Sequence, residues 1–160
     1  NSFIYVSTDV KHKNHLRLLD AWSLLLKNNW NYTLHLTIPL QNIKLVSIIN
    51  DLNNKGANII NHGIIDRSRA LELYQNSEYL IHPSLEESFG LGLIEAFHMG
   101  CKIIAPNLPY VYEIIDPDIT FNAEDVNSIA LSLQHSIDYK SFKSKLKIQD
   151  NTDKLINTLC

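Results

Sequence analysis

Short apolar runs alternate along the chain with longer stretches in which apolar residues recur at helical spacing. The first run, Phe3 to Val6, predicts a strand, and the pattern from Leu16 to Leu26 predicts a helix, with Asn14 placed as its cap. Tyr32 to Ile38 alternates as a second strand, and Ile43 to Leu52 predicts a second helix. The chain therefore opens with two strand–helix units.

The same alternation continues to about residue 138. The later strands are predicted at Ala57 to Asn61, Tyr79 to Ile81, Lys102 to Ala105 and Ile119 to Phe121, and the later helices after a cap at Asp66, from Leu91 to Met99, from Pro109 to Ile115 and from Asp125 to Asp138. Short connections between alternating strands and helices are typical of a parallel sheet with right-handed crossovers. We therefore predict an α/β protein, a Rossmann-like three-layer α/β/α sandwich with a mostly parallel six-stranded sheet.

Composition fits one globular domain and argues against several other classes. The chain has 160 residues, of which 45% are hydrophobic and 19% charged, and its net charge is −3, so no basic surplus indicates a nucleic-acid partner. No apolar run approaches the roughly 20 residues of a membrane span. Cys101 and Cys160 lack metal-ligand spacing and are predicted to be reduced thiols.

The end of the chain differs in composition from the rest. Residues 140–147 are basic and weakly patterned, which predicts a solvated face, and a last helix is predicted near Asp153 to Leu159. We divide the chain into a domain over residues 1–139 and a tail over residues 140–160 that belongs to it. Because the chain begins without Met and opens directly into a strand, we expect it to be a domain of a longer protein.

Residues suited to ligand binding gather at the predicted carboxyl ends of the strands, where open α/β sheets bind their ligands. The first strand leads into Ser7, Thr8 and Lys13, the third into His62-Gly63-Ile64, and the fourth into His82-Pro83-Ser84-Leu85-Glu86-Glu87. Small hydroxyls, histidines, a lysine and paired carboxylates therefore share one predicted edge. That concentration is expected of a binding site.

The loop after the fourth strand predicts phosphate binding. In Phe89-Gly90-Leu91-Gly92 the glycines open a helix, and a helix N-terminus with bare amides attracts a diphosphate through oriented donors and the macrodipole. Lys13 could complete the charge neutralisation, and Glu95, one turn into the helix, is placed to accept hydrogen bonds from a ribose diol. The alternative is a tight turn flanked by surface glutamates. No dinucleotide or P-loop glycine motif is present.

A longer motif carries a family resemblance. The segment His82 to Ala105 contains Pro83-Ser84, two glutamates, Glu87 and Glu95, around Ser88-Phe89-Gly90-Leu91, a helix end at Gly100 and a following strand. It closely resembles the hallmark of the group 1 (family 4-like) retaining glycosyltransferases, and Lys13-Asn14-His15 resembles their first loop. The similarity covers about residues 3–133. It implies the C-terminal, donor-binding half of a GT-B fold, whose N-terminal acceptor domain is absent from this chain.

The resemblance also implies the role of each site residue. Glu87 and Lys13 correspond to the catalytic positions, Glu87 contacting the donor sugar and Lys13 the diphosphate. Ser88, Phe89, Gly90 and Leu91 would hold diphosphate or sugar, Glu95 the ribose, and Gly63 and Ile64 the base. Ser7 and Thr8 stand where many relatives have Gly-Arg, so one phosphate-binding cation is missing or replaced, by Lys11 or His12.

Other residues stay second-tier in this interpretation. His82 could line the site, whereas His98, near a helix end, is predicted to be structural and His62 is given no role. Glu86 is expected to face solvent beside Glu87, unless a one-residue shift exchanges their roles, and Glu113 is kept as a second-tier candidate. Trp22 and Trp30, at helical spacing, are predicted to be packing residues rather than a sugar platform.

The expected function is transfer of a hexose-type sugar from a nucleotide diphosphate-sugar, UDP- or GDP-linked, to a glycan or lipid-linked acceptor. We expect no cofactor and no metal, a cytoplasmic location with contact to the inner face of the membrane, and little activity from the isolated domain. Two alternatives remain open: a non-catalytic sugar-nucleotide-binding module, favoured by Ser7-Thr8, and a GT-B-fold sugar-nucleotide epimerase.

Overall fold

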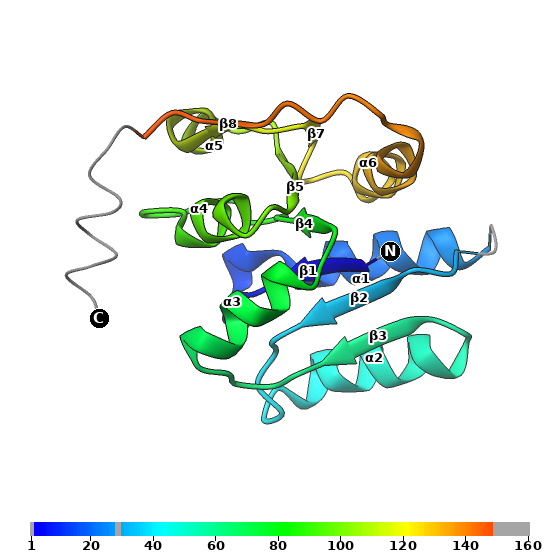
Figure 1. Cartoon of the computed structure of the whole chain (residues 1–160). Helices are drawn as coiled ribbons and strands as arrows, with labels where there is room; N and C mark the ends of the chain where they lie inside the picture. The colour runs from blue at the N-terminus through cyan, green and yellow to red at the C-terminus, as the bar shows by residue number, and fades with distance from the viewer. Residues whose placement is uncertain (1, 28–29, 149–160) are drawn as a thin grey trace.

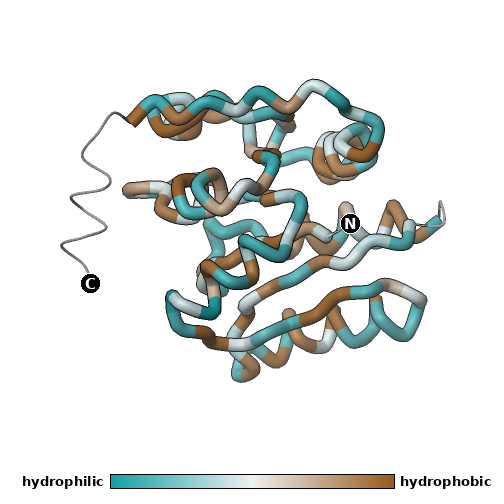
Figure 2. Tube along the Cα trace, in the orientation of Figure 1, coloured by the Kyte–Doolittle hydropathy of each residue, from teal (hydrophilic) through white to brown (hydrophobic). Residues whose placement is uncertain are grey.

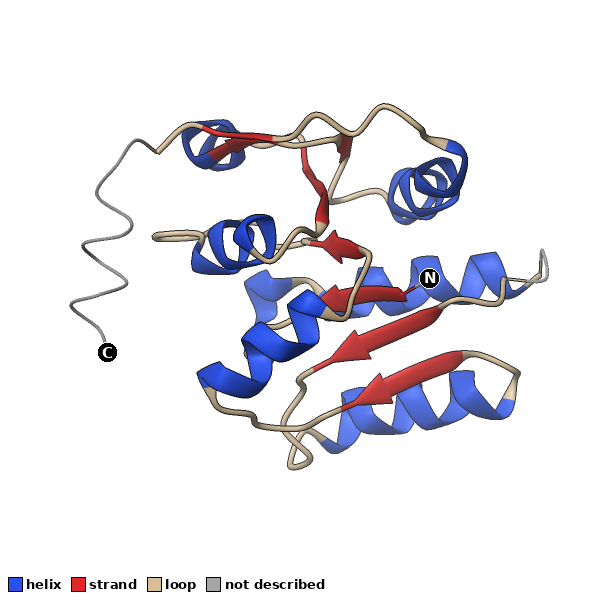
Figure 3. Cartoon of the chain, in the orientation of Figure 1, coloured by secondary structure: helices blue, strands red, loops and turns tan. Residues whose placement is uncertain are grey.

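A six-stranded parallel sheet forms the middle layer of the protein (Figures 1 and 3). The computed structural model describes residues 2–27 and 30–148. The strands are β1 (Ser2–Tyr5), β2 (Thr33–Leu36), β3 (Asn58–Asn61), β4 (Tyr79–Ile81), β5 (Lys102–Pro106) and β7 (Ile119–Phe121), and every neighbouring pair in the order β3-β2-β1-β4-β5-β7 is parallel. The predicted α/β class and six-stranded sheet are confirmed.

Helices connect the strands as the sequence predicts. They are the 3-10 turn η1 (Lys11–Lys13) and the helices α1 (His15–Leu26), α2 (Ile43–Asn54), α3 (Arg67–Gln75), α4 (Leu91–His98), α5 (Pro109–Ile114) and α6 (Val126–Asp138). Asp66 and Asp125 precede α3 and α6 and accept hydrogen bonds from backbone amides of their first turns. In the part of the chain that the structure describes, no helix has the length and apolar character needed to cross a membrane.

Two hydrophobic cores lie on opposite faces of the sheet. The side chains of Phe3 and Tyr5 pack into the core formed with α1, α2 and α6, whereas that of Ile4, between them, packs into the core formed with α3, α4 and α5. Leu80 and Ile103 join the second core. Successive strand residues point to opposite faces, so strands buried on both sides must be apolar throughout. Figure 2 shows these apolar strand segments inside the molecule.

An aromatic cluster fills the core beneath α1. Phe3 stacks on Tyr79 with ring centroids 4.7 Å apart and contacts the ring of Trp22 edge-on at 5.6 Å. Trp22 is fully buried and also packs against Trp30. The prediction that these two tryptophans are packing residues is confirmed.

The predicted basic tail is more structured than expected. After α6 the chain returns along the β7 edge of the sheet, and β8 (Lys145–Leu146) pairs antiparallel with β6 (Ile115–Asp116) (Figure 1). The carboxylate of Asp118 accepts hydrogen bonds from the amides of Lys143 and Ser144. As predicted, the lysines of this segment, Lys140, Lys143, Lys145 and Lys147, are exposed. Backbone pairing to the segment after α5 holds the segment in place. The helix predicted near residues 153–159 lies outside the described residues.

Asn14 occupies the N-cap position of α1 but does not cap the helix with its side chain, which corrects the prediction. Its φ is +62°, and no helix amide bonds to its side chain. Instead the buried Nδ2 donates to the carbonyl oxygens of Pro83 at 3.0 Å and Ala123 at 2.8 Å. Oδ1 accepts from Arg17 at 2.9 Å. One amide therefore joins the segments that follow β1, β4 and β7.

We expect Asn14→Ala to lower the free energy of unfolding by about 2–4 kcal/mol, because two buried carbonyls lose their donor and the residue keeps a left-handed backbone. Asn14→Asp should cost at least as much near neutral pH, since a carboxylate would face those carbonyls. Urea unfolding measures both. Asn76→Ala, which removes one exposed amide bond, serves as control and should cost about 0.5 kcal/mol. Equal losses for positions 14 and 76 would contradict the assigned role.

Candidate functional site

A cavity of about 600 Å³ opens at the carboxyl ends of β1 and β4. These strands are neighbours in the sheet, so the loop after each one and the N-terminus of α4 meet at one place. The lining residues are Val6, Ser7, Thr8, His12, Lys13, Tyr74, His82, Glu86, Glu87, Ser88, Phe89, Gly90, Leu91, Gly92 and Glu95. The structure thus brings together every predicted site residue except Gly63 and Ile64.

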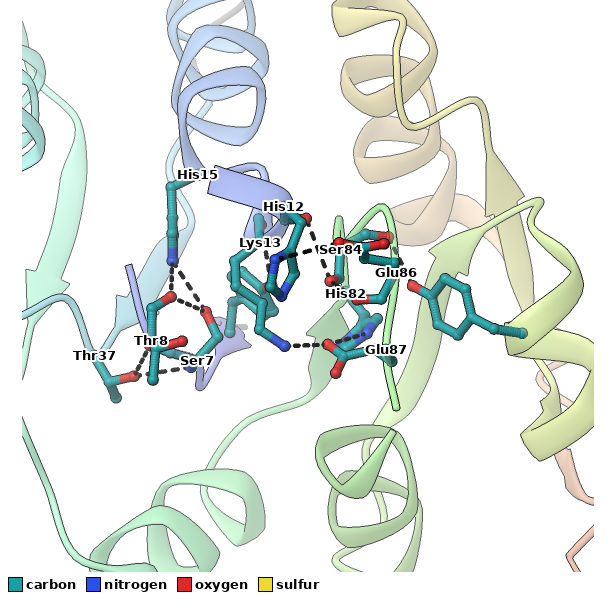
Figure 4. A network of polar contacts seen from close by, with 12 residues as sticks. Ser7, Thr8, His12, Lys13, His15, Thr37, His82, Ser84, Glu86 and Glu87 are labelled. Atoms are coloured by element: carbon teal, nitrogen blue, oxygen red, sulfur yellow. Dashed lines mark hydrogen bonds and ion pairs between the residues drawn. The ribbon is translucent and has the colours of Figure 1, made fainter. Parts of the chain in front are cut away.

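An ion pair between Lys13 and Glu87 forms part of the cavity lining. Lys13 Nζ is 2.6 Å from Glu87 Oε1, and the two side chains are 15% and 14% exposed. Figure 4 shows them reaching toward each other from the β1 and β4 sides. An incoming anion could take Lys13 from Glu87, and Glu87 would then be free to accept a hydrogen bond from another group.

His82 lies under this pair. It is fully buried at the end of β4, and its Nε2 is 3.4 Å from Glu87 Oε1 but has no hydrogen-bond partner in the described part of the chain. Burial lowers the pKa of His82, against the opposing effect of Glu87. The imidazole is therefore neutral near pH 7. Its contact with Glu87 favours the ionised form of that carboxylate.

The pKa of Glu87 is depressed despite its burial. Desolvation raises it, but contacts with His82 and Lys13 outweigh that effect and lower the pKa of Glu87 to about 2. Glu87 is therefore ionised at neutral pH and acts as an acceptor or an electrostatic partner rather than as a proton donor. Its outer neighbour, Glu86, is 76% exposed and lies 3.6 Å from His12.

The start of α4 presents free donors to the cavity. Gly90, the residue before the helix, has φ +60°, and a Cβ there would lie 2.3 Å from Ile114 Cδ1. This left-handed turn leaves the amides of Leu91 and Gly92 without a hydrogen-bond partner among the described residues. The glycine-dependent helix N-terminus predicted from the sequence is therefore present.

Side chains from other elements hold the Ser7-Thr8 loop. The Nε2 atom of His15 lies 2.9 Å from the Thr8 carbonyl oxygen and 3.0 Å from Ser7 Oγ. The Thr37 hydroxyl accepts from the Ser7 amide at 3.0 Å and donates to the Ser7 carbonyl at 3.1 Å. Burial lowers the pKa of His15, so it holds the loop as a neutral ring. No sequence pattern predicts these roles of His15 and Thr37, because both act through contacts with distant backbone.

Arg67 is a further residue that sequence reasoning missed. It begins α3, and its Nε donates to Glu95 Oε1 at 3.0 Å. Glu95 is 18% exposed and Arg67 42% exposed. The two residues are 28 positions apart in the sequence, and their contact joins α3 to α4. No local pattern signals such a pair.

Several predicted residues lie elsewhere. Gly63 and the 77% exposed Ile64 follow β3 and do not line the cavity. His62 is hydrogen-bonded to His35 at 3.0 Å. Of the two proposed replacements for a missing cation, His12 lines the cavity, whereas Lys11 lines a separate recess. Neither His98 nor Glu113 is among the lining residues.

The depressed pKa of Glu87 predicts an acid-dependent loss of stability. A carboxylate whose folded pKa is about 2, against 4.5 unfolded, stabilises the fold above about pH 4.5 and loses that contribution as the pH falls through 4.5 toward 2. Between about pH 6 and pH 3 the loss should be roughly 2 kcal/mol. Urea unfolding at each pH should show this loss in the wild type but not in Glu87→Gln. The exposed neighbour variant Glu86→Gln should behave like the wild type; if it matched Glu87→Gln, the assignment would be wrong.

The backbone at Gly90 gives a second prediction. Gly90→Ala combines a positive φ with the contact to Ile114, whereas Gly100→Ala has a similar φ of +87° and open space around its Cβ. We expect Gly100→Ala to cost about 1 kcal/mol of stability and Gly90→Ala about 1–2 kcal/mol more. Thermal or urea unfolding measures the difference. Equal losses of stability in the two variants would mean that the Ile114 side chain moves away from the new Cβ without a penalty.

Known proteins resemble this chain in sequence. Residues 1–149 match the family model described as glycosyl transferases group 1. The capsular polysaccharide biosynthesis glycosyltransferase CapH of Staphylococcus aureus is 35% identical over 115 residues, which are 68% of this chain and 31% of that protein. The serotype-specific mannosyltransferase WbdA of Escherichia coli is 28% identical over 140 residues, 84% of this chain and 17% of that protein. The chain thus spans less than a third of the length of these relatives.

Solved structures share the fold. The C-terminal domain of the group 1 glycosyl transferase LpcC from Francisella tularensis superposes with a TM-score of 0.71 and 22% identity, covering 86% of this chain and 75% of that one. The catalytic domain of cholesterol-alpha-glucosyltransferase from Helicobacter pylori gives a TM-score of 0.68 and 18% identity, with 86% of each chain covered. These likenesses show that the chain has the Rossmann-like fold of GT-B glycosyltransferases.

Proposed function

The chain belongs to the glycosyl transferases group 1 family, and we propose that it is the donor-binding domain of a retaining hexosyltransferase. The observation that carries the proposal is the shared cavity in which Lys13, Glu87, Glu95 and the free amides of α4 face one space. A nucleotide diphosphate-sugar has an anionic centre, a ribose diol and a polyhydroxylated ring, and this lining offers a partner for each.

The diphosphate is assigned to Lys13 and the start of α4. The helix N-terminus supplies the oriented amides of Leu91 and Gly92, and Lys13 supplies a cation. Lys13 is paired with Glu87. When the diphosphate binds, it replaces Glu87 as the anionic partner of Lys13. Glu87, released and still ionised, then accepts hydrogen bonds from the donor sugar.

The ribose is assigned to Glu95, next to the free amides. Arg67 holds the Glu95 carboxylate from the rim of the cavity. The base is assigned to the backbone near Gly63 and Ile64, beyond the cavity rim, and the donor is UDP- or GDP-linked. No cofactor is invoked.

In the transfer step, an acceptor hydroxyl oxygen forms a bond to the anomeric carbon while the bond from that carbon to the diphosphate oxygen breaks. The electron pair leaves with the diphosphate, which also takes the hydroxyl proton. Charge building on the diphosphate is stabilised by Lys13 and the α4 amides. The acceptor is a glycan or glycolipid held mainly by a further domain of the whole protein, which works in the cytoplasm, against the inner face of the membrane. The isolated domain is expected to have little activity.

A second candidate is a sugar-nucleotide-binding module without catalysis. Ser7 and Thr8 line the cavity where many family members have Gly-Arg. Among the described residues, the lining then contains one lysine, Lys13, and no arginine. Assay of the intact gene product for donor turnover separates the two functions. Steady turnover with an acceptor mixture favours the transferase, and tight donor binding without turnover favours the module.

Calorimetric titration with UDP, GDP, ADP and their hexose conjugates tests donor binding. We expect Glu95→Ala to weaken the free nucleotide by about 10-fold, since a charged hydrogen-bond acceptor for the ribose is lost. Glu87→Ala should spare the free nucleotide and weaken the sugar-bearing form. Glu72→Ala, on the exposed side of α3, is the matched control and should change neither.

Two outcomes of this titration would contradict the proposal. Equal losses from Glu87→Ala and Glu95→Ala would refute the separate assignment of sugar and ribose. Absence of binding by every nucleotide at millimolar concentration would refute the donor domain itself.

A further inference from the structure

A second groove lies on the far side of the β4–α4 loop from the cavity. It has a volume of about 660 Å³ and lies at the carboxyl ends of β5 and β7. Leu85 lines the groove, and Glu87, two residues later in the same loop, lines the cavity. The two spaces are therefore separated by the width of one loop.

Two asparagines on the groove have their amides oriented in advance. Asn107 Oδ1 accepts from the Tyr112 hydroxyl at 2.8 Å, and Asn122 Oδ1 accepts from the Glu124 amide at 3.0 Å. Each Nδ2 therefore points its two N–H donors elsewhere, and neither has a hydrogen-bond partner in residues 2–27 and 30–148. Both side chains are exposed. A ligand with hydroxyl or ether oxygens would satisfy these donors.

The charge and polarity of the groove restrict its ligand. Glu124 contributes a carboxylate, and Thr120 and Ser128 contribute hydroxyls. Among the described residues, no lysine or arginine lines the groove. An anionic ligand would meet the carboxylate with no counter-charge, which disfavours phosphates and acidic chains. The apolar side chains of Leu85, Leu108 and Phe121 complete the lining. Amides, a carboxylate and an apolar surface together suit the hydroxyl edge and C–H face of a neutral sugar.

We propose that this groove binds a neutral glycan and is an acceptor subsite of the transferase. The proposal rests on the proposed function, because a glycan here matters for transfer only if the neighbouring cavity holds the donor. Hydrogen bonds fix the loop between them: the Tyr110 hydroxyl donates to the Ser84 carbonyl at 2.7 Å and the Leu85 amide to the His12 carbonyl at 2.8 Å. A glycan chain seated in the groove would thus have one end directed toward the Glu87 side at a fixed spacing.

The test uses a neutral α-linked mannose trisaccharide as probe and a uronic-acid-containing trisaccharide as comparator. Titration of the ¹⁵N-labelled 160-residue chain by NMR should shift the amide signals of the β5 and β7 ends with the neutral probe, at millimolar affinity, and not with the acidic one. Asn107→Asp and Asn122→Asp keep the accepting oxygen and remove the donor. We expect each to weaken the neutral trisaccharide at least 5-fold while UDP and GDP affinity changes less than 2-fold.

Asn127→Asp is the matched control, since it makes the same chemical change on exposed α6 outside the groove lining, and it should bind the trisaccharide like the wild type. Unchanged unfolding midpoints show that the variants fold. If the trisaccharide does not bind while a nucleotide does, the groove proposal is overturned and the donor site stands. If the trisaccharide binds in the groove and no nucleotide binds, the donor domain is refuted instead. Loss of glycan binding in Asn127→Asp equal to that in Asn122→Asp also overturns the assignment.

Discussion

The arrangement of this site depends on the buried amide of Asn14. Its two donated hydrogen bonds tie the loop after β1 to the ends of β4 and β7, and its left-handed backbone turns the chain from η1 into α1. Lys13 precedes it directly, so the position of that lysine relative to Glu87 follows from the same anchor. A side chain on a loop is only as well placed as the contacts that hold the loop. Here Asn14 joins the loop to two other strand ends, and His15 and Thr37 hold its first residues.

The two less exposed carboxylates of the cavity, Glu87 and Glu95, are each paired with a cation. Glu87 is ionised, Lys13 neutralises it, and His82 stays uncharged beneath them because burial disfavours its protonated form. A second pair, Arg67 with Glu95, repeats the pattern at the rim. An anion entering the cavity would therefore have to replace existing partners rather than fill bare charges. A simple salt ion offers no simultaneous match for both pairs.

Much of the fold could be predicted from periodicity, because strands buried on both faces are short apolar runs and the helices keep one apolar side. Asp66 and Asp125 directly precede two helices, because the side chain of each accepts a hydrogen bond from an amide of the first turn. The candidate site was predictable through its motif from Glu87 to Glu95. Features that depend on contacts between distant segments could not be predicted from the sequence. They are the role of Asn14, the Arg67–Glu95 contact and the pairing of β8 with β6. Whether the predicted residues bind donor remains a prediction.

The strand order has a consequence for how the domain folds. β1 lies inside the sheet, paired with β2 through Phe3 and Leu34 on one side and with β4 through Phe3 and Tyr79 on the other. During synthesis β2 and β3 become available first, so one edge of β1 stays open until β4 leaves the ribosome. Parallel pairing over such sequence distances is slow, and an open apolar edge invites intermolecular association. The period in which residues 37–79 are synthesised is therefore the period in which this edge of β1 is unpaired.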